Sequence, residues 1–421
     1  MWRVCLCAMP SPPGVASAAP FHAEPSPFAM ALSLALLLGT QAMATDLYLP
    51  ALPMLARDLS ADMPAVQMTM AVFVLAFGLA QLLWGPVADR FGRRPVLRAG
   101  VALFALASLG AALARDVSAV VVWRAIQGAG VAAAVVCARA MLRDVFEPNR
   151  GAHVMSQALT GLGLIAIAAP IAGGALAAAA GWRSTMALLA AFGAGLLAFV
   201  VWRVPETVRA RNPQATQASA LLVQLGRALA HPAFRAWTLL VCGTYGGLMV
   251  FLAGASFVLI DHLGLSAWQC GLAMGSNSVA YVVGTFICRR LLARHGLVGA
   301  VQRGAAFTAL AGVGLAWTAA TTSTPSVWAV LLPQWIYALG HGVHQPCGQA
   351  GAVGPFPHAA GVASALTGFM LALTGAAVAL WLGQHLSASR PQSYFAALAA
   401  MAGLTSLVAW TLVRRNGAAH A

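Results

Sequence analysis

The sequence predicts an all-α polytopic membrane protein with twelve transmembrane helices in two pseudo-symmetric six-helix bundles. Two observations support this prediction. Of the 421 residues, 60% are hydrophobic and 8% are charged, and the mean hydropathy is +0.81, which excludes a soluble globular protein. The apolar residues also form continuous segments, each close to the roughly 20 residues that a helix needs to cross a bilayer.

These apolar segments do not alternate with polar residues, so they are expected to be helices and not the strands of a membrane barrel. The predicted spans are 29–49, 65–87, 96–114, 118–140, 155–179, 184–203, 236–259, 269–290, 298–319, 326–349, 359–383 and 393–413. The longest polar break lies between the sixth and seventh spans. We therefore expect a disordered tail over 1–27, an N-terminal bundle over 28–204, a cytoplasmic linker over 205–234, a C-terminal bundle over 235–414 and a short tail over 415–421.

The net charge of +14 at first suggests a nucleic-acid partner, but the arginines fall in alternate short loops and form no patch interleaved with aromatic residues. The arginine-rich loops follow the second, fourth, sixth, eighth and twelfth spans. By the positive-inside rule, both termini are expected in the cytoplasm of a bacterium, with the chain in the inner membrane. The charge therefore predicts topology, and no nucleic-acid partner is expected.

A short, charge-dense stretch separates the second and third spans. Gly85 and Gly92 permit a tight reversal, while Arg90, Arg93 and Arg94 surround a single acid, Asp89. The arginines alone are equally consistent with an ordinary positive-inside loop. The whole pattern, G-P-x-A-D-R-x-G-R-R-P, resembles the signature loop between helices two and three of the major facilitator superfamily of transporters. We expect Asp89 to accept from a helix N-terminus or to pair with Arg143 as part of an inner gate; the alternative is a solvated loop acid.

Asp46 is a carboxylate within an apolar segment, near the outward end of the first span. Loss of water favours the neutral acid, so this side chain is expected to load and release a proton; the alternative is a hydrated position at the membrane interface. The stretch T-D-x-Y-L-P-A-L-P closely resembles helix one of the bicyclomycin-resistance type (Bcr/CflA) drug:proton antiporters. That resemblance implies a role for Asp46 in proton coupling.

Arg124 is the second charged residue at membrane depth, and it lies at a depth similar to that of Asp46. A buried arginine needs an acceptor, which is either Asp46, directly or through water, or backbone carbonyl groups in a purely structural role. The motif R-x-x-Q-G, formed with Gln127 and Gly128, is similar to the helix-four motif of the same superfamily. The resemblance implies that Arg124 takes part in proton coupling.

The fifth span contains Pro170, Gly173 and Gly174, which allow a kink and close helix packing. An ordinary packed membrane helix would explain these residues equally well. The span resembles the antiporter motif of drug exporters and retains P-x-x-G-G, although Ile165 and Ala169 stand where that motif prefers glycine.

Five polar or aromatic residues are candidates for the substrate cavity: Tyr48, Gln127, Tyr245, Asn277 and Gln345. His341 and His344 either titrate or line a cavity, or they are hydrated near a cytoplasmic end. The scattered cysteines and histidines do not have the spacing of a metal site, so no metal is expected.

Two bundles around one titratable intramembrane acid predict a secondary transporter, and the resemblance implies export of small amphipathic drugs in exchange for protons. Export of a metabolite such as an amino acid, dipeptide or sugar is the alternative. An enzyme is disfavoured because no nucleophile with a nearby base and no H-E-x-x-H is present, and a sensor because no signalling domain is seen. The chain has no phosphate-binding loop and no lysine, so a proton gradient without any cofactor is the expected energy source. The expected partners are a small-molecule substrate, protons and lipid, with the protein a monomer.

Overall fold

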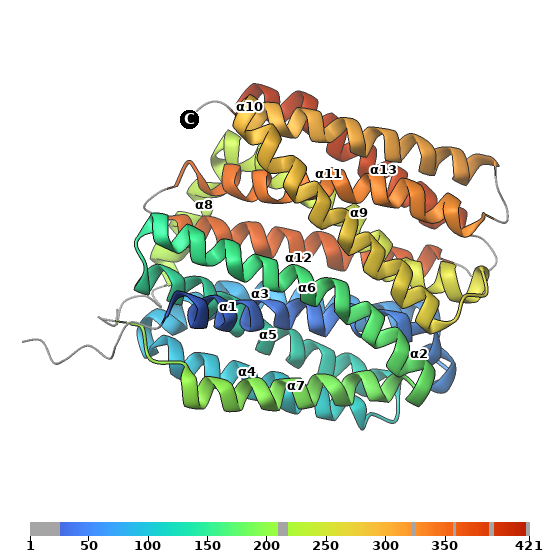
Figure 1. Cartoon of the computed structure of the whole chain (residues 1–421), viewed down its shortest axis with the longest axis horizontal. Coiled ribbons are helices and arrows are strands. Elements are labelled where there is room, and N and C mark those ends of the chain that lie inside the picture. The colour runs from blue at the N-terminus through green and yellow to red at the C-terminus, as the bar shows by residue number, and fades with distance from the viewer. Residues whose placement is uncertain (1–25, 209–217, 322–324, 357–358, 387–390, 418–421) are drawn as a thin grey trace, which may run out of the picture.

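The computed structural model describes residues 26–208, 218–321, 325–356, 359–386 and 391–417, and every regular element within these ranges is a helix (Figure 1). The first half contains α1 (Pro27–Asp46), η1 (Leu49–Ala51), α2 (Leu52–Asp58), α3 (Met63–Phe91), α4 (Arg93–Ala112), α5 (Val117–Val145), α6 (Pro148–Ala180) and α7 (Trp182–Arg203). The second half contains α8 (Ala218–Ala230), α9 (Pro232–Ser256), η2 (Phe257–His262), α10 (Ala267–Thr321), α11 (Val327–Val353), α12 (Ala360–His385), α13 (Gln392–Val408), η4 (Ala409–Val413) and α14 (Arg414–Asn416).

Twelve membrane crossings follow from these elements. Among the residues that the structure describes, ten helices are long and apolar enough to cross a bilayer. One of them, α10, contains two crossings, because Gly296 interrupts it with a φ of 64°. The remaining crossing is α11, which has 27 residues but contains two prolines and two histidines. The predicted all-α fold with twelve membrane helices is therefore confirmed.

Four of the helices begin where the sequence supplies a capping side chain. The side chains of Ser26, Asp62, Asp116 and Ser326 each accept a hydrogen bond from the backbone N–H three residues later, at 2.8–3.2 Å. Each such bond satisfies a donor that would otherwise lack a partner in the first helical turn. These caps mark the starts of α1, α3, α5 and α11.

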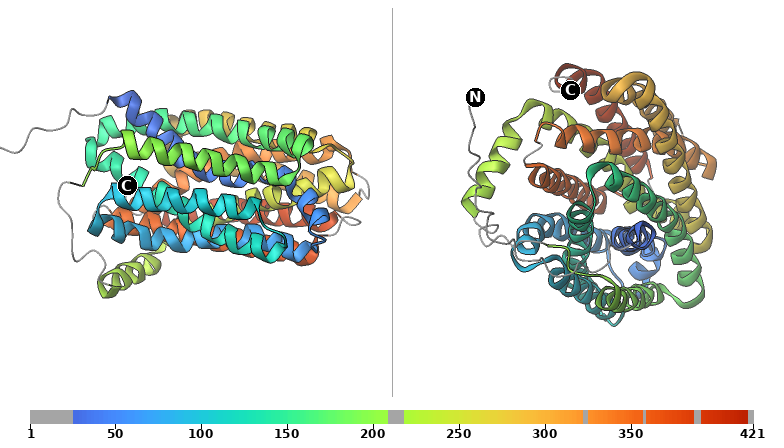
Figure 2. Two further views of the ribbon diagram at one scale, coloured as in Figure 1. Left: turned by 90° about the horizontal axis from the view of Figure 1, so that it is seen from below. Right: turned by 60° about the vertical axis from the view of Figure 1, so that its left-hand side comes forward.

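The helices lie roughly parallel, with α1 to α7 on one side of the molecule and α9 to α13 on the other (Figures 1 and 2). The two halves meet most extensively where α3 packs against α12 and where α6 packs against α10. Many large apolar side chains on the outside are exposed, among them Leu83, Leu106 and Trp317, as expected for a surface that faces lipid.

Several helices extend beyond the predicted spans. Helix α5 was expected to end at residue 140 and continues to Val145, while α6 begins at Pro148 and not at residue 155. Charged residues such as Arg143 and Arg150 are too polar to count as membrane-spanning, but they still adopt helical backbone. The expected linker over 205–234 similarly contains a helix, α8, and residues 209–217 lie outside the described ranges, as do the tail residues 1–25 and 418–421.

The stretch Gly85–Pro95 is mostly helix, which corrects the expected loop. Helix α3 continues to Phe91, so Gly85 lies inside the helix and takes no part in a turn. A side chain at Gly85 would also have open space, because no atom lies within 4 Å of where its Cβ would stand. The chain reverses at Gly92 alone, whose φ of 105° favours glycine. Gly296 makes the corresponding turn in the second half, with a φ of 64°, so the two halves share this feature.

Candidate functional site

A cavity of about 90 Å³ lies between the two halves of the molecule. It is lined by α1, α3 and α5 from the first half and by α9, α11 and α12 from the second. Two of the five predicted cavity residues, Tyr245 and Gln345, line it. The other polar lining residues are Gln41, Gln81, Arg139, Gln349, Ser364 and Thr367.

Tyr48, Gln127 and Asn277 do not line this cavity, because each is buried in contacts within its own half. The hydroxyl of Tyr48 lies 3.0 Å from that of Thr69, and Gln127 donates to the Ser108 hydroxyl at 2.7 Å. The side-chain oxygen of Asn277 accepts from Gln334 at 3.2 Å. Polar residues at membrane depth therefore satisfy one another here and do not all face the central space.

Asp46 is the last residue of α1 and is half-buried. Its carboxylate accepts a hydrogen bond from the Thr45 hydroxyl at 2.8 Å. The same carboxylate is near enough to Tyr245 for a direct electrostatic interaction, and Tyr245 lines the cavity. The structure therefore brings the predicted coupling acid and one predicted cavity residue together, across the boundary between the two halves.

Arg124 is fully buried in α5 and forms no ion pair with Asp46 in the described part of the chain. Its guanidinium donates to the carbonyl oxygen of Ala44 at 2.8 Å and to the side-chain oxygen of Gln127. The guanidinium also lies over the rings of Phe73, at 4.1 Å, and Tyr48, at 4.7 Å. Of the two alternatives, carbonyl contact is the one present in this conformation, and it ties Arg124 to the backbone two residues before Asp46.

Pro170, Gly173 and Gly174 lie in α6 at a close approach between helices. A Cβ on Gly173 would lie 2.0 Å from the carbonyl oxygen of Leu47, the residue after Asp46. A Cβ on Gly174 would lie 2.3 Å from the carbonyl oxygen of Ala267, at the start of α10 in the other half. These glycines therefore let α6 contact the end of α1 and the second half at once.

At the end of the bundle that contains α2, here called the α2 end, three polar contacts join the two halves. Arg57 forms an ion pair with Asp261 at 3.0 Å. The Ser256 hydroxyl donates to the carbonyl oxygen of Leu49 at 2.6 Å, and Gln67 donates to that of Ala253 at 2.8 Å. These contacts hold the two halves together at the α2 end.

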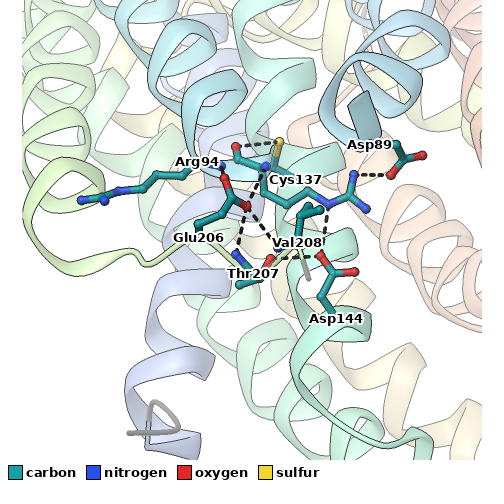
Figure 3. Close-up of polar contacts among 8 residues, drawn as sticks. Asp89, Arg94, Cys137, Asp144, Glu206, Thr207 and Val208 are labelled. Carbon is teal, nitrogen blue, oxygen red and sulfur yellow. Dashed lines mark hydrogen bonds and ion pairs between the residues drawn. The ribbon is translucent and has the colours of Figure 1, made fainter. Parts of the chain in front are cut away.

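The opposite end, here called the arginine-rich end, contains a polar network around the Gly92 turn (Figure 3). Glu206 accepts from the backbone N–H groups of Arg93 and Arg94 at 2.9 and 3.1 Å, and so caps the start of α4. The Arg93 guanidinium contacts Asp89 at 2.5 Å and Asp144 at 3.1 Å, and Asp144 also accepts from Thr207 at 3.0 Å. The negative carboxylate of Glu206 is favourable at a helix N-terminus.

The expected pair of Asp89 with Arg143 is not formed, because Asp89 pairs with Arg93 one helical turn later in the sequence. Arg143 is exposed at the end of α5, and its guanidinium lies 3.8 Å from where a Cβ on Gly361 of α12 would stand. Arg94 donates to the carbonyl oxygen of Val201 at 2.8 Å, and Arg90 lies over the Phe91 ring.

His341 and His344 are buried and not hydrated, at 4% and 0% exposure. His341 lies 3.0 Å from the Thr244 hydroxyl, and His344 lies 3.2 Å from the carbonyl oxygen of Val301. Neither lines the cavity.

Sequence reasoning missed three charged residues: Arg139, Asp144 and Glu206. Arg139 could have been found by the signal that identified Arg124, since it also interrupts an apolar span. The stretch Pro205-Glu206-Thr207 resembles the family at the end of the sixth span, but nothing in the sequence indicates the partners of Glu206 or Asp144, which lie on other helices.

The arrangement of the helices agrees with what known proteins show. A family model described as Major Facilitator Superfamily matches residues 34–379. The chain belongs to the major facilitator superfamily. It is 29% identical over 382 residues to multidrug resistance protein D of Escherichia coli, covering 90% of this chain and 94% of that protein. It is 27% identical over 353 residues to a bicyclomycin resistance protein homolog of Haemophilus influenzae, covering 84% and 88%.

A solved structure of the same fold is the xylose transporter XylE from E. coli in an inward-open conformation. It superposes with a TM-score of 0.70 at 18% identity, over 91% of this chain and 96% of that one. The predicted resemblance to drug-resistance transporters of the Bcr/CflA type is confirmed, and the chain is a multi-pass membrane transporter and not an enzyme.

Proposed function

We propose that this superfamily member exports small amphipathic drugs in exchange for protons, with Asp46 as the residue that carries the proton. The carrying observation is the position of Asp46. Its carboxylate lies within electrostatic range of Tyr245, which lines the cavity, and within the described chain no ion pair holds it. An acid without a bound cation takes up a proton without first breaking a salt bridge.

Arg124 acts as a positioning residue in this proposal. Its contact with the Ala44 carbonyl fixes the end of α1. A positive charge that approaches a carboxylate favours the ionised form of that carboxylate. A rotation of α5 or α1 that changes the Arg124–Asp46 separation would therefore shift the proton equilibrium of Asp46. That change would link proton release to the conformational step.

The α2 end and the arginine-rich end of the bundle differ in their contacts, and this difference supports an alternating-access cycle. We place the arginine-rich end in the cytoplasm and the α2 end outside, as the distribution of arginines favours. The two halves are then held together at the outer end by Arg57–Asp261, Ser256–Leu49 and Gln67–Ala253. Export requires these contacts to break while the halves close at the arginine-rich end.

The membrane potential can drive this cycle. Each proton charge that moves inward supplies about 2.3 kcal/mol per 100 mV. Protonation of Asp46 from outside would release the substrate, and deprotonation toward the cytoplasm would allow the next substrate to bind.

The test is proton release from purified protein in weakly buffered detergent after addition of bicyclomycin, of other drugs, or of amino acids, dipeptides and sugars. The variant is Asp46→Asn. The matched control is Asp62→Asn, because Asp62 caps α3 and asparagine caps a helix equally well. Drug-induced release in the wild type and the control, but not in Asp46→Asn, supports the proposal. Release by metabolites alone would show that the substrates are metabolites and not drugs. Release from Asp46→Asn equal to that from the wild type would show that Asp46 does not carry the proton.

A further inference from the structure

We infer that the cavity selects substrates carrying a carboxylate, with Arg139 as the counter-charge that binds it. This inference rests on the proposed function only in taking the cavity as the substrate site. Arg139 lies on α5, two turns before its end, and lines the cavity from the first half. Arg139 is half-buried and lies within the predicted fourth membrane span, 118–140. Its side chain lines the central cavity.

Arg139 lacks a partner among the residues that the structure describes. No hydrogen bond or ion pair joins it to any of them. Its charged neighbour on α5 is Arg143, one turn later, which adds positive charge. An arginine side chain at membrane depth is energetically unfavourable unless an anion pairs with it. A guanidinium that has no partner and lines a cavity therefore indicates a ligand with an anionic group.

The charge of the cavity points the same way. None of the described residues that line it is Asp or Glu, so Arg139 gives its walls a net positive charge. Asp46 does not line the cavity and is linked to it only by its electrostatic effect on Tyr245, on α9. A cationic drug would therefore meet a like charge and no acceptor carboxylate in the space that Arg139 lines, which is an unfavourable pairing.

The remaining walls define the rest of the ligand. Gln81 is 4% exposed, and its side-chain amide has a buried atom without a hydrogen-bond partner, as has that of Gln345 on the opposite half. Both side chains line the cavity. Unpaired buried amides favour a ligand that donates and accepts hydrogen bonds. Val74, Phe77 and Leu371 add apolar surface, so the expected ligand has an apolar body, an amide-like group and a carboxylate.

Three fluorescent probes with one apolar body separate these possibilities. Dansylglycine carries a carboxylate, dansylglycinamide is neutral, and N-dansylethylenediamine carries a positive charge. Each is titrated into the full-length protein in detergent at pH 7, without any gradient. We expect dansylglycine to bind about tenfold more tightly than the neutral probe, as one charge-assisted interaction provides, and the cation to bind most weakly.

The variants are Arg139→Gln, which removes the charge, and Arg139→Lys, which keeps it. Arg235→Gln is the matched control, because Arg235 is exposed near the start of α9 at the same end of the membrane. Thermal unfolding of each variant shows that it is folded. Arg139→Gln should abolish the preference for dansylglycine and leave the affinity for dansylglycinamide unchanged, while Arg139→Lys should restore part of the preference.

Equal binding of the three probes to the wild type, a preference for the cation, or no binding of dansylglycine would overturn the inference. So would an Arg139→Gln variant that keeps the preference. These results would not bear on proton coupling, because binding is measured at equilibrium and at one pH. Conversely, failure of the Asp46→Asn test would leave the charge preference of the cavity intact.

Discussion

Two arginines on the same helix show that one residue type at membrane depth can have different roles. Arg124 and Arg139 are 15 residues apart on α5, about 22 Å along its axis. Arg124 is fully buried, donates to Ala44 and Gln127, and lies over two aromatic rings. Arg139 is half-buried, lines the cavity, and forms no hydrogen bond or ion pair with the described residues.

The difference teaches that the partners of a membrane arginine, more than its depth, indicate its role. A guanidinium that donates to acceptors of the protein itself holds helices together, and here the Nη1 of Arg124 holds the end of α1 that contains Asp46. A guanidinium whose donors are unused is available to a ligand. The following four predictions test this comparison, in order of decreasing effect.

Replacing Arg124 should have the largest effect on stability. Arg124→Leu removes the buried donors to Ala44 and Gln127 and the contacts with the Tyr48 and Phe73 rings. We expect a loss of about 3 kcal/mol, because buried acceptors lose their partners. Thermal unfolding in detergent, followed by tryptophan fluorescence, measures the loss. A melting temperature equal to that of Arg235→Gln would show that these contacts do not stabilise the protein.

Replacing Gln127 should have the next largest effect. Gln127→Leu keeps the volume but leaves Arg124 and the Ser108 hydroxyl without their shared partner. The expected cost is about 1–3 kcal/mol. Gln349→Leu is the control, since Gln349 lines the cavity and its replacement should leave the melting temperature unchanged. Equal melting temperatures for the two variants would contradict the prediction.

Replacing Arg139 should change the stability in the opposite direction. Arg139→Leu removes an unpaired charge from membrane depth, so we expect the protein to gain about 1 kcal/mol in stability while it loses the preference for dansylglycine. The same thermal unfolding measurement and probe titration test both parts. A destabilisation as large as that of Arg124→Leu would mean that Arg139 is held by partners within the protein.

Replacing Arg143 should have the smallest effect. Arg143 is exposed and one turn from Arg139, so it strengthens the positive charge of the cavity only at a distance. Arg143→Gln should weaken dansylglycine binding by about twofold, because interactions between separated charges are screened by water and salt. A tenfold loss in the same titration would instead make Arg143 a direct ligand-binding residue.

Much of the site could be predicted from local sequence. Asp46 and Arg124 stand out because charge inside an apolar span is rare, and the structure brings both to the end of α1. Gly92 was predicted to make a turn and does so, whereas Gly85 was predicted to share it and lies within α3. Hydropathy records where a helix leaves the hydrocarbon, not where its backbone hydrogen bonds end, so helix lengths were underestimated.

The partners of these residues could not be predicted from the sequence. Asp89 was expected to meet Arg143, and instead it pairs with Arg93, while Asp144 and Thr207 complete the network from distant parts of the chain. Tyr48, Gln127 and Asn277 were expected to face the cavity, and they are buried in contacts within their own halves. Which side of a helix faces a neighbour depends on how the helices rotate as they pack.

The sequence by itself determined that this chain is a twelve-helix membrane protein with few intramembrane charges, because transfer of apolar segments into lipid depends on composition alone. The tertiary structure decided which of those charges are satisfied and which are open to a ligand. Arg124 and Arg139 stand in similar apolar sequence, and only the packing of α1, α3 and α4 against α5 buries one guanidinium among acceptors and leaves the other in the cavity. The physical reason is that hydrogen bonds and ion pairs join atoms that are distant in the chain, so their geometry exists only once the helices have assembled.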